Sequence, residues 1–554
     1  MGDGADLVLT GGAVWTGRPD RPFAEAVAVR GGRVVSVGSA REVRDAVGHA
    51  GEAVELGGRA VLPGFQDAHC HPTSGGLQMR RCDLGEALTM AQCHDAVREY
   101  LRRDPGAPWV LGSGWSMETF PGGTPDAASL DLVCGDRPAF LVNRDGHSAW
   151  VNGRALALAG IDASSPDPAH GRIERLASGE PQGTLHDGAM DLVGRLVPVT
   201  GSEELEAALA DAQRHLLSLG VTGWQDAMVG DDVQRAYESL ASSGQLRARV
   251  RLALWWDRER GVEQVRELVA RRASAARMGI DASSVKIMLD GVVETRTAAL
   301  LDPYLVPGGG GGCGHEHGTG KLFLEPELAE EAVRLVAAEG FQVHFHAIGD
   351  RAVRVALDAV AAAGERADAR RLRHHVAHVQ VVHPDDVPRF HRLGVAVNAQ
   401  PFWACVEPQM TELTIPVLGQ ERSSWQYRFA TLADSGAVLA GGSDWPVSTA
   451  NPLEEIAVAV SRALPESARH GAAPEEPFLP SERIALATAI GAFTAGSAYV
   501  NHRESDSGTI EPGKLADLVV LEHDPFETGA DRLPEARVRL TMLAGAVAHE
   551  DGSL

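Results

Sequence analysis

The sequence is short of positive charge and of long apolar runs. Its 554 residues include 51 Lys and Arg against 75 Asp and Glu, which leaves a formal net charge of −24. Nucleic acids and anionic membrane surfaces would repel such a chain. No apolar stretch approaches the length that spans a bilayer. We therefore expect no nucleic acid and no membrane among the partners of this protein.

We also expect neither a leader nor a cysteine framework. The first six residues carry no basic segment, and no apolar core of signal-peptide length follows them. No Cys-x-x-Cys pair occurs, so neither a disulfide framework nor a cysteine zinc site is indicated. The six cysteines are scattered at Cys70, Cys82, Cys93, Cys134, Cys313 and Cys405. A cytoplasmic protein is the simplest expectation.

Both ends of the sequence read as short β strands. Runs rich in β-branched residues flank Gly-Gly, Pro-Gly or Ala-Gly turns, and they lie at 6–15, 26–38, 508–521 and 538–549. Each pair of strands is too small to bury a face alone. Pairing the two ends solves this for both, so we expect one small β-sandwich domain built from residues 1–62 and 507–554.

Between these ends the pattern alternates helix and strand. Amphipathic stretches precede short apolar runs at 203–226, 327–346, 350–378 and 434–444. So many such units favour a closed parallel sheet. We therefore expect an α/β protein in which residues 63–506 form a (β/α)8 TIM-like barrel. Segment 82–199, rich in Pro, Gly and Asp turns, fits the alternation poorly, and we expect it to be an insertion, partly β, over the barrel mouth.

The segment 61–71, Val-Leu-Pro-Gly-Phe-Gln-Asp-Ala-His-Cys-His, carries the first chemical signal. His69 and His71 are two residues apart, so on a strand they project from the same face. Two imidazoles at a strand end form half of a site for Zn²⁺, Mn²⁺ or Fe²⁺. Taken alone, this motif is equally compatible with two unrelated surface histidines.

Later strands each end in a residue that can bind a metal. His346 and His378 close two expected strands, and Asp444 closes the last one before Trp445. Active sites of such barrels lie at the carboxyl ends of the strands. We therefore expect His69, His71, His346, His378 and Asp444 to converge on one or two divalent metals, with Zn²⁺ as the first expectation and Mn²⁺ or Fe²⁺ as alternatives.

The chain resembles the amidohydrolase superfamily along essentially its whole length. Its finer motifs resemble the amidohydrolase-3 branch, the YtcJ-like proteins that include N-substituted formamide deformylases. Besides the segment 61–71, the motifs are Asp145-Gly-His-Ser-Ala-Trp-Val-Asn152, Val285-Lys-Ile-Met-Leu-Asp-Gly291, His346-Ala-Ile-Gly-Asp-Arg351, Gly442-Ser-Asp-Trp-Pro446 and the run from Gly508 to Val519. One departure is Ala377, where this branch usually has glutamate; it removes a carboxylate partner expected for His378.

The resemblance gives Lys286 a possible role in the metal site. This lysine lies in the apolar segment 284–289, where an unpaired ammonium would be costly. It either extends to the barrel mouth or pairs with Asp290, or, as the resemblance implies, it is carboxylated by CO₂ and its carbamate bridges two metals. His344 shares a face with His346 but lies one pleat deeper, and we expect it in the core or behind the ligands.

Five residues are candidates for contact with a substrate. The resemblance singles out His147 and Asp145, although a histidine that only stabilises a turn is the alternative. Trp115 and Trp403, together with Trp445, are candidates for the lining of an apolar pocket. Tryptophan side chains are nevertheless more often packed in a core than placed in a binding pocket.

The function implied by the resemblance is hydrolysis of a C–N bond in an amide, formamide or cyclic amide by metal-activated water. Asp444 would take the proton from the water and pass it to the leaving nitrogen. A mononuclear deaminase of an aminated ring would use the same histidines without Lys286. A non-catalytic binding or assembly barrel would typically have lost ligands, and none is lost here. The expected partners are a small-molecule substrate and a second copy in a homodimer.

Overall fold

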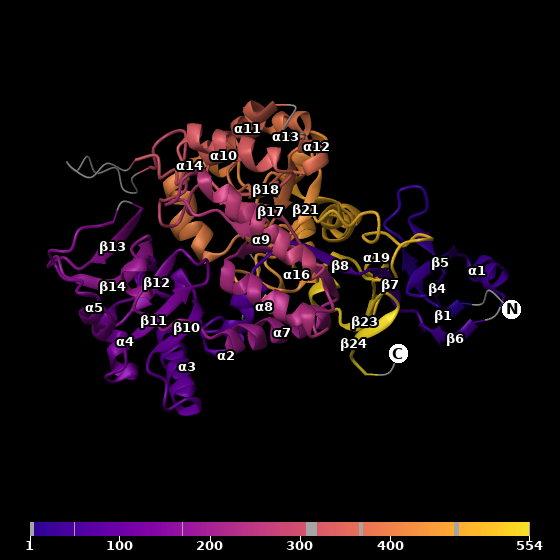
Figure 1. Cartoon of the computed structure of the whole chain (residues 1–554), viewed down its shortest axis with the longest axis horizontal. Helices are drawn as coiled ribbons and strands as arrows, with labels where there is room; N and C mark the ends of the chain where they lie inside the picture. The colour runs from indigo at the N-terminus through magenta and orange to yellow at the C-terminus, as the bar shows by residue number, and fades with distance from the viewer. Residues whose placement is uncertain are drawn as a thin grey trace.

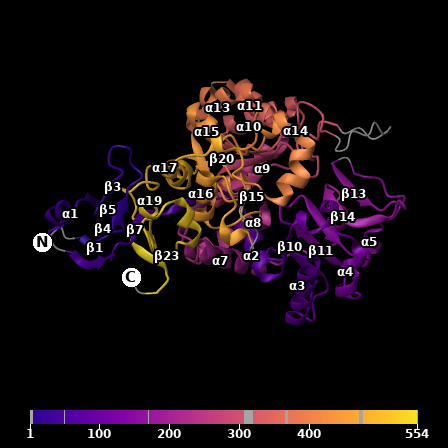
Figure 2. The same ribbon diagram turned by 180° about the vertical axis from the view of Figure 1, so that it is seen from behind.

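The computed structural model describes residues 5–48, 50–168, 170–305, 318–364, 369–469 and 476–552, so Cys313 lies outside the described residues. Figure 1 shows a central barrel with the segment of α3–α5 and β10–β14 at one end and the sheets of both termini at the other. The view from behind in Figure 2 shows the same order. Within these ranges, no helix is both long and apolar enough to cross a membrane.

The barrel sheet consists of eight parallel strands, and each pairs with the next in chain order. The strands are β8 (Phe65–Cys70), β15 (Val221–Val229), β16 (Arg249–Trp255), β17 (Asp281–Met288), β18 (Gln342–Ala347), β19 (His375–His378), β20 (Ala396–Ala399) and β21 (Leu439–Gly441). Most of their residues are buried, as the near-continuous apolar runs of a parallel sheet require. The expected α/β barrel is therefore confirmed.

The seam between β8 and β21 is closed by side-chain and backbone hydrogen bonds. Asp67 Oδ1 accepts the Ser443 N–H at 3.1 Å, and its Oδ2 accepts the Ser443 hydroxyl at 2.5 Å. The Asp444 N–H donates to the His69 carbonyl at 2.7 Å. Asp67 is 1% exposed, and this burial raises the pKa of its carboxyl group to about 7. The loop that carries Asp444 is thus tied directly to the strand that carries His69.

Amphipathic helices cover the barrel. In α11 (Asp350–Ala363) the buried residues Val353, Ala356 and Val360 recur every three or four positions, so one face packs on the sheet. The other long covering helices are α7 (Ser202–Ser218), α8 (Asp231–Ser242), α9 (Val265–Arg277), α10 (Pro326–Ala338) and α16 (Pro452–Ser461). Figure 1 shows α10, α11 and α13 (Val387–Leu393) on one side and α7 and α8 on the other.

The segment between β8 and α7 forms its own six-stranded sheet. Its strands are β9 (Cys82–Asp83), β10 (Val110–Trp115), β11 (Ala139–Asn143), β12 (Ser148–Val151), β14 (Pro181–Asp187) and β13 (Gly171–Arg175), in that spatial order. The helices α3 (Met90–Arg103), α4 (Ala127–Cys134) and α5 (Gly153–Ala159) pack on it, with separate apolar clusters around Trp115 and around Leu185. We refer to residues 82–199 as the insertion.

Strands from both ends of the sequence pair with each other. One sheet has the order β5-β4-β1-β6, and the other has the order β24-β23-β22-β7-β2-β3. The bounds of these terminal strands are β1 (Ala5–Thr10), β2 (Ala13–Trp15), β3 (Phe23–Ala24), β4 (Ala26–Arg30), β5 (Arg33–Gly38), β6 (Ala50–Glu55), β23 (Val538–Leu543) and β24 (Ala546–Glu550). Here β7 (Ala60–Pro63) runs antiparallel to β22 (Leu518–Leu521), with Val61 opposite Val520. One apolar cluster joins both sheets, including Leu9 and Val27 of the first and Leu540 of the second. We propose residues 1–62 and 507–554 as one domain on this ground.

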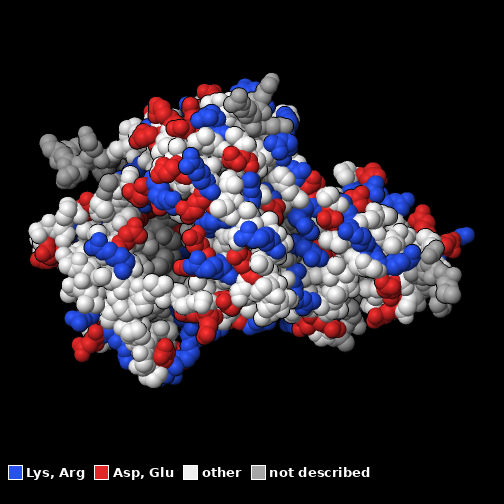
Figure 3. Space-filling model, viewed as in Figure 1, with Lys and Arg blue, Asp and Glu red and all other residues white. Residues whose placement is uncertain are grey.

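The surface carries both signs of charge. Figure 3 shows Lys and Arg interspersed with Asp and Glu over the barrel, while the visible part of the insertion is largely uncharged. A hollow is visible between the insertion and the barrel. This hollow corresponds to a cavity of about 790 Å³ lined by residues of both.

Candidate active site

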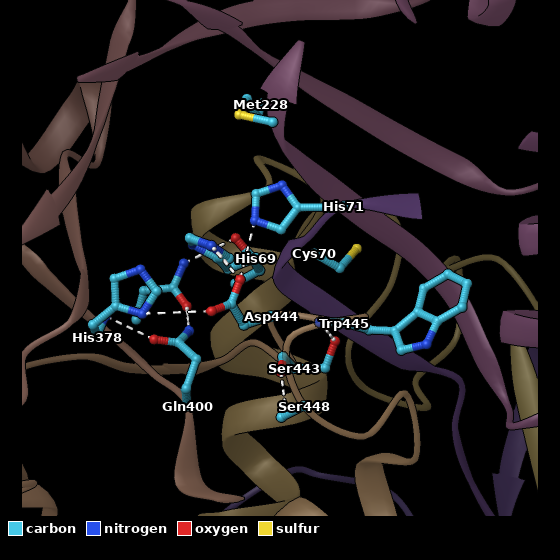
Figure 4. A network of polar contacts seen from close by, with 12 residues as sticks. His69, Cys70, His71, Met228, His378, Gln400, Ser443, Asp444, Trp445 and Ser448 are labelled. Carbon is cyan, nitrogen blue, oxygen red and sulfur yellow. Dashed lines mark hydrogen bonds and ion pairs between the residues drawn. The ribbon is translucent and has the colours of Figure 1, made fainter. Parts of the chain in front are cut away.

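Two histidines and an aspartate meet at the carboxyl end of the barrel. His69 lies near the end of β8, His71 directly follows that strand, and Asp444 follows β21. Asp444 Oδ1 is 3.0 Å from His71 Nε2 and 3.1 Å from His69 Nε2. One ligand atom from each residue can be chosen so that all three lie within 4.8 Å of one another. Figure 4 shows both imidazoles directed towards the carboxylate.

The remaining candidate ligands lie beside this group. His378 Nδ1 is 3.8 Å from Asp444 Oδ2, and its ring centroid is 4.9 Å from that of His69. The ring of His346 follows at 4.4 Å from that of His378. Lys286, on β17, lines the same cavity and is 3% exposed. The structure therefore brings together all six residues expected around the metal.

Burial controls the protonation of these groups. Burial lowers the pKa values of His69, His346 and His378 well below the usual range, which favours neutral imidazoles at physiological pH. Burial also lowers the pKa of Lys286 to about 7. Asp444 behaves differently. Burial alone would raise its pKa, but the imidazoles of His69 and His71 hold it well below the usual range and keep the carboxylate ionised.

The donor set fits a divalent cation. Neutral imidazole nitrogens and an ionised carboxylate are the forms in which histidine and aspartate bind Zn²⁺. Asp444 Oδ1 faces two imidazole nitrogens at once, and His71 Nδ1 is buried with no hydrogen-bond partner among the described residues. A divalent cation would accept lone pairs from the imidazoles and the carboxylate together, so the cluster suits a shared cation.

The insertion supplies a histidine–aspartate pair to the opposite wall of the cavity. His147 Nδ1 lies 2.7 Å from Asp187 Oδ1, and the His147 ring centroid is 5.7 Å from that of His346. Asp145 Oδ1 accepts the backbone N–H of His147 at 2.8 Å and fixes the turn. Burial alone would lower the pKa of His147, but the hydrogen bond and charge of Asp187 raise it to about 9. His147 is therefore cationic at neutral pH.

A second polar group lies in the cavity wall. The Arg144 guanidinium stacks over the Trp403 ring at 4.9 Å and donates to Gln409 Oε1 at 3.3 Å. Its ion-pair distances to Glu118 and Glu407 are 3.9 and 3.8 Å. Arg144 and Trp403 both line the cavity, so they can contact a bound molecule.

Two of the three tryptophans do not reach the cavity. Trp115 is fully buried in the insertion, where its indole N–H donates to the Leu141 carbonyl and its ring packs on Phe120. Trp445 lies beside His215 under α2 (Pro72–Arg80) and is not among the cavity-lining residues. Core packing explains both positions. The expectation that Trp115 binds substrate is therefore corrected.

Sequence reasoning missed Asp187, Arg144 and the residues beneath His69. Asp187 is 40 positions from His147, and only the antiparallel pairing of β12 and β14 brings their segments together. Arg144 is adjacent to the motif that contains His147, which was the one local signal for it. His344, expected in the core or behind the ligands, lies with its Nε2 2.8 Å from His69 Nδ1.

Known proteins match this chain over nearly its full length. The model of the Amidohydrolase family matches residues 52–549. Among curated proteins, LONG AFTER FAR-RED 3 of Arabidopsis thaliana is 32% identical over 94% of this chain and 88% of its own length. The putative amidohydrolase YtcJ of Bacillus subtilis is 30% identical over 98% of both chains. The N-substituted formamide deformylase of Arthrobacter pascens is 26% identical over 98% of both chains.

Solved structures show the same architecture. An uncharacterized metal-dependent hydrolase from Pyrococcus furiosus superposes with a TM-score of 0.68 at 25% identity, over 94% of this chain and 99% of that one. The resemblance to the amidohydrolase-3 branch, read from the motifs, is thereby confirmed. The barrel, the converging ligands and these matches lead to one conclusion: the chain belongs to the amidohydrolase family and is a hydrolase.

Proposed function

We propose that this protein hydrolyses a C–N bond of a small amide, formamide or cyclic amide, with one or two divalent metals held by His69, His71, His346, His378, Asp444 and Lys286. The observation that carries the proposal is the approach of His69, His71 and Asp444 at the floor of the cavity, opposite the cationic His147. The relative named for formamide deformylation supports the choice of bond. Zn²⁺ is the proposed metal, and Mn²⁺ and Fe²⁺ suit the same ligands.

A bound divalent metal would lower the pKa of a water molecule and polarise the scissile carbonyl. Asp444 is held ionised at the cavity floor, so it can accept a proton from the attacking water and return it to the leaving nitrogen. Its Oδ1 is shared by His69 and His71, which keeps the carboxylate at one position.

His147 would stabilise negative charge that develops on the substrate oxygen. Its Nδ1 is bound to Asp187, so its Nε2–H is the free donor of a cationic ring in a buried wall. A pre-positioned donor of this kind accelerates acyl transfer because it needs no reorganisation when the charge appears. The large cavity around it is lined by Trp255, Phe323, Trp403 and Tyr427, which would exclude bulk water from a bound substrate.

Lys286 is proposed as a carbamate. Its depressed pKa leaves much of the amine neutral at physiological pH, and a neutral amine adds CO₂ with release of one proton. The resulting anion would be compensated by metal, which solves the problem of a charge buried in β17. Without this modification, only the protonated fraction of Lys286 is stabilised by the charge of Asp444.

The test measures metal and activity together. Chelation should abolish amide or formamide hydrolysis, and Zn²⁺ or Mn²⁺ should restore it. Metal analysis and intact-protein mass spectrometry then count the ions and the 44-Da carbamate increment. Lys286→Ala should lose binuclear occupancy and regain part of it with short carboxylates. Full hydrolysis by metal-free protein would overturn the proposal, and deamination of aminated rings without loss on Lys286→Ala would favour a mononuclear deaminase.

A further inference from the structure

A buried chain of polar side chains lies beneath the proposed metal site, in the interior of the barrel. It begins at His69 and continues through His344 on β18, Gln225 on β15 and Gln342 on β18 to Arg251 on β16. These residues are at most 4% exposed. Polar groups at this depth are costly unless each finds a partner, so their donor and acceptor roles must agree along the whole chain.

The lower end of the chain has only one possible orientation. Gln342 Nε2 lies 2.8 Å from both the Arg373 and the Val500 carbonyl oxygens, which can only accept hydrogen bonds. Its Oε1 lies 3.2 Å from Arg251 Nε, which can only donate. The amide of Gln342 therefore cannot be flipped, and its Oε1 must accept from the next residue upward.

The orientation of the Gln342 amide determines the donor and acceptor roles of each residue up to His69. Gln225 donates from Nε2 to Gln342 Oε1 at 3.2 Å, so Gln225 Oε1 faces His344 Nδ1 at 2.7 Å and must accept its N–H. A neutral His344 then presents a lone pair at Nε2. His69 Nδ1 lies 2.8 Å from that nitrogen and must donate to it. A neutral His69 thus keeps the lone pair on Nε2, the nitrogen that faces Asp444.

A second, independent branch requires the same orientation of Gln225. The His378 backbone N–H donates to Gln400 Oε1 at 2.7 Å, and Gln400 Nε2 donates to Asn398 Oδ1 at 2.8 Å (Figure 4 shows His378 and Gln400). Asn398 Nδ2 then donates to His375 Nδ1 at 3.0 Å. His375 must carry its proton on Nε2, which lies 3.2 Å from Gln225 Oε1. Both branches make this oxygen the acceptor.

We propose that His344 and Gln225 are positioning residues that hold His69 as the Nδ1–H tautomer and so reserve its Nε2 for the metal. This inference rests on the proposed metal site. One branch is anchored on the Arg373 and Val500 carbonyls, and the other is anchored on the His378 N–H. These backbone groups cannot exchange donor and acceptor roles, so they determine the tautomer of His69. Outer partners of this kind typically change metal affinity by about 10- to 100-fold.

The test compares variants at His344 by Zn²⁺ affinity, measured in competition with a chromogenic chelator. His344→Phe keeps a ring but offers His69 no acceptor, and it should bind Zn²⁺ about 10- to 100-fold more weakly. His344→Gln places an amide oxygen near the former Nε2 and should recover most of the affinity. His344→Asn reaches only the former Nδ1 and should not. Because Gln and Asn are both small and polar, their difference stands even where the phenylalanine variant folds poorly.

A matched control and a second readout complete the experiment. His374→Phe removes another fully buried histidine of the same barrel, one whose Nδ1 accepts the Val343 N–H, and it should leave Zn²⁺ affinity nearly unchanged. Two-bond ¹H–¹⁵N spectra of histidine-labelled, Zn²⁺-loaded wild-type protein should show an imidazole that is protonated at Nδ1 and bound to Zn²⁺ through Nε2. The signals of this imidazole should be absent from the spectrum of His69→Gln.

The outcomes separate this inference from the proposed function. Wild-type protein that binds no Zn²⁺ contradicts the metal site itself. Wild-type binding that is tight, with equal affinities for His344→Gln and His344→Asn, contradicts the positioning role alone. Binding of Zn²⁺ through His69 Nδ1 contradicts the tautomer.

Discussion

Asp444 joins two of the proposed ligands through a single oxygen. Because that carboxylate oxygen lies 3.0 and 3.1 Å from two imidazole nitrogens, Asp444→Asn should keep the shape and one ligating oxygen while losing the ability to accept a proton. We expect hydrolysis to fall by about 10² to 10⁴ with most of the metal retained. Metal analysis and steady-state kinetics on the same sample test this. A parallel loss of metal and rate that saturating Zn²⁺ reverses would show that Asp444 is only a ligand.

The pair formed by His147 and Asp187 predicts a pH dependence. The pKa of His147 is raised to about 9, so its cationic form is complete well below that pH and is lost as the pH rises through it. The value of kcat/KM should therefore fall as the pH rises through about 9, which gives the pH profile an alkaline limb. Asp187→Asn removes the carboxylate that raises the pKa, and the limb should move to lower pH.

A matched control exists in the same sheet for this pH profile. His186 Nε2 contacts Glu174 Oε1 at 3.1 Å, and neither residue lines the cavity. Glu174→Gln should leave the alkaline limb where it is in the wild type. An unchanged limb in Asp187→Asn would remove His147 from the chemistry.

At the scale of elements, the seam between β8 and β21 depends on one serine. Ser443→Ala leaves Asp67 Oδ2 without the hydroxyl and the Trp445 N–H without its acceptor, both in a buried position. Unsatisfied buried groups cost about 1 to 3 kcal/mol each. The apparent melting temperature should therefore fall clearly below that of Ser435→Ala, where a partly buried hydroxyl only donates to the Leu432 carbonyl. Equal melting temperatures would contradict this account of the seam.

The elements that motifs mark were predictable from the sequence. β8, which carries His69 and is followed by His71, and β18 and β19, which carry His346 and His378 near their ends, are apolar runs that stop at a loop. β16 was missed because its arginines interrupt the apolar pattern. Arg249 and Arg251 are compensated by Asp517 and Asp281, and the first of these partners lies 268 positions away. Such distant compensation leaves no local signal.

In the candidate site, too, some residues could be predicted from the sequence and others could not. The ligand-type residues could be found because each ends a strand, whereas the pairs that orient them could not. His69 and His344 are 275 positions apart, and Gln225 and His375 are 150 apart. A glutamine in a buried strand resembles any other polar residue until the closed barrel places it under the histidines. The homodimer and the cytoplasmic location remain predictions.

At the scale of the molecule, the sheet that joins both ends supports the barrel as well as itself. Thr541 on β23 (Val538–Leu543) donates to the Leu217 carbonyl of α7, and Val519 of β22 belongs to the main apolar cluster. Deleting residues 508–554 would remove the antiparallel partner of β7, leave β7 paired with β2 alone and expose the apolar cluster around Val61. We expect the truncated protein to aggregate, as measured by its soluble fraction and by light scattering. A soluble, monodisperse truncation with native circular dichroism would contradict this expectation.

During synthesis, β7 emerges long before β22, the strand with which it pairs. Strand β7 ends at Pro63 and its partner begins at Leu518, so the ribosome must add the whole barrel between them. At about 5 to 20 residues per second, the first strand waits roughly 20 to 90 s for its neighbour. During that interval its hydrogen-bonding edge and apolar face are open to other nascent chains. Synthesis of this protein therefore favours conditions in which chaperones attend the nascent chain, and crowded overproduction would be limited by that wait.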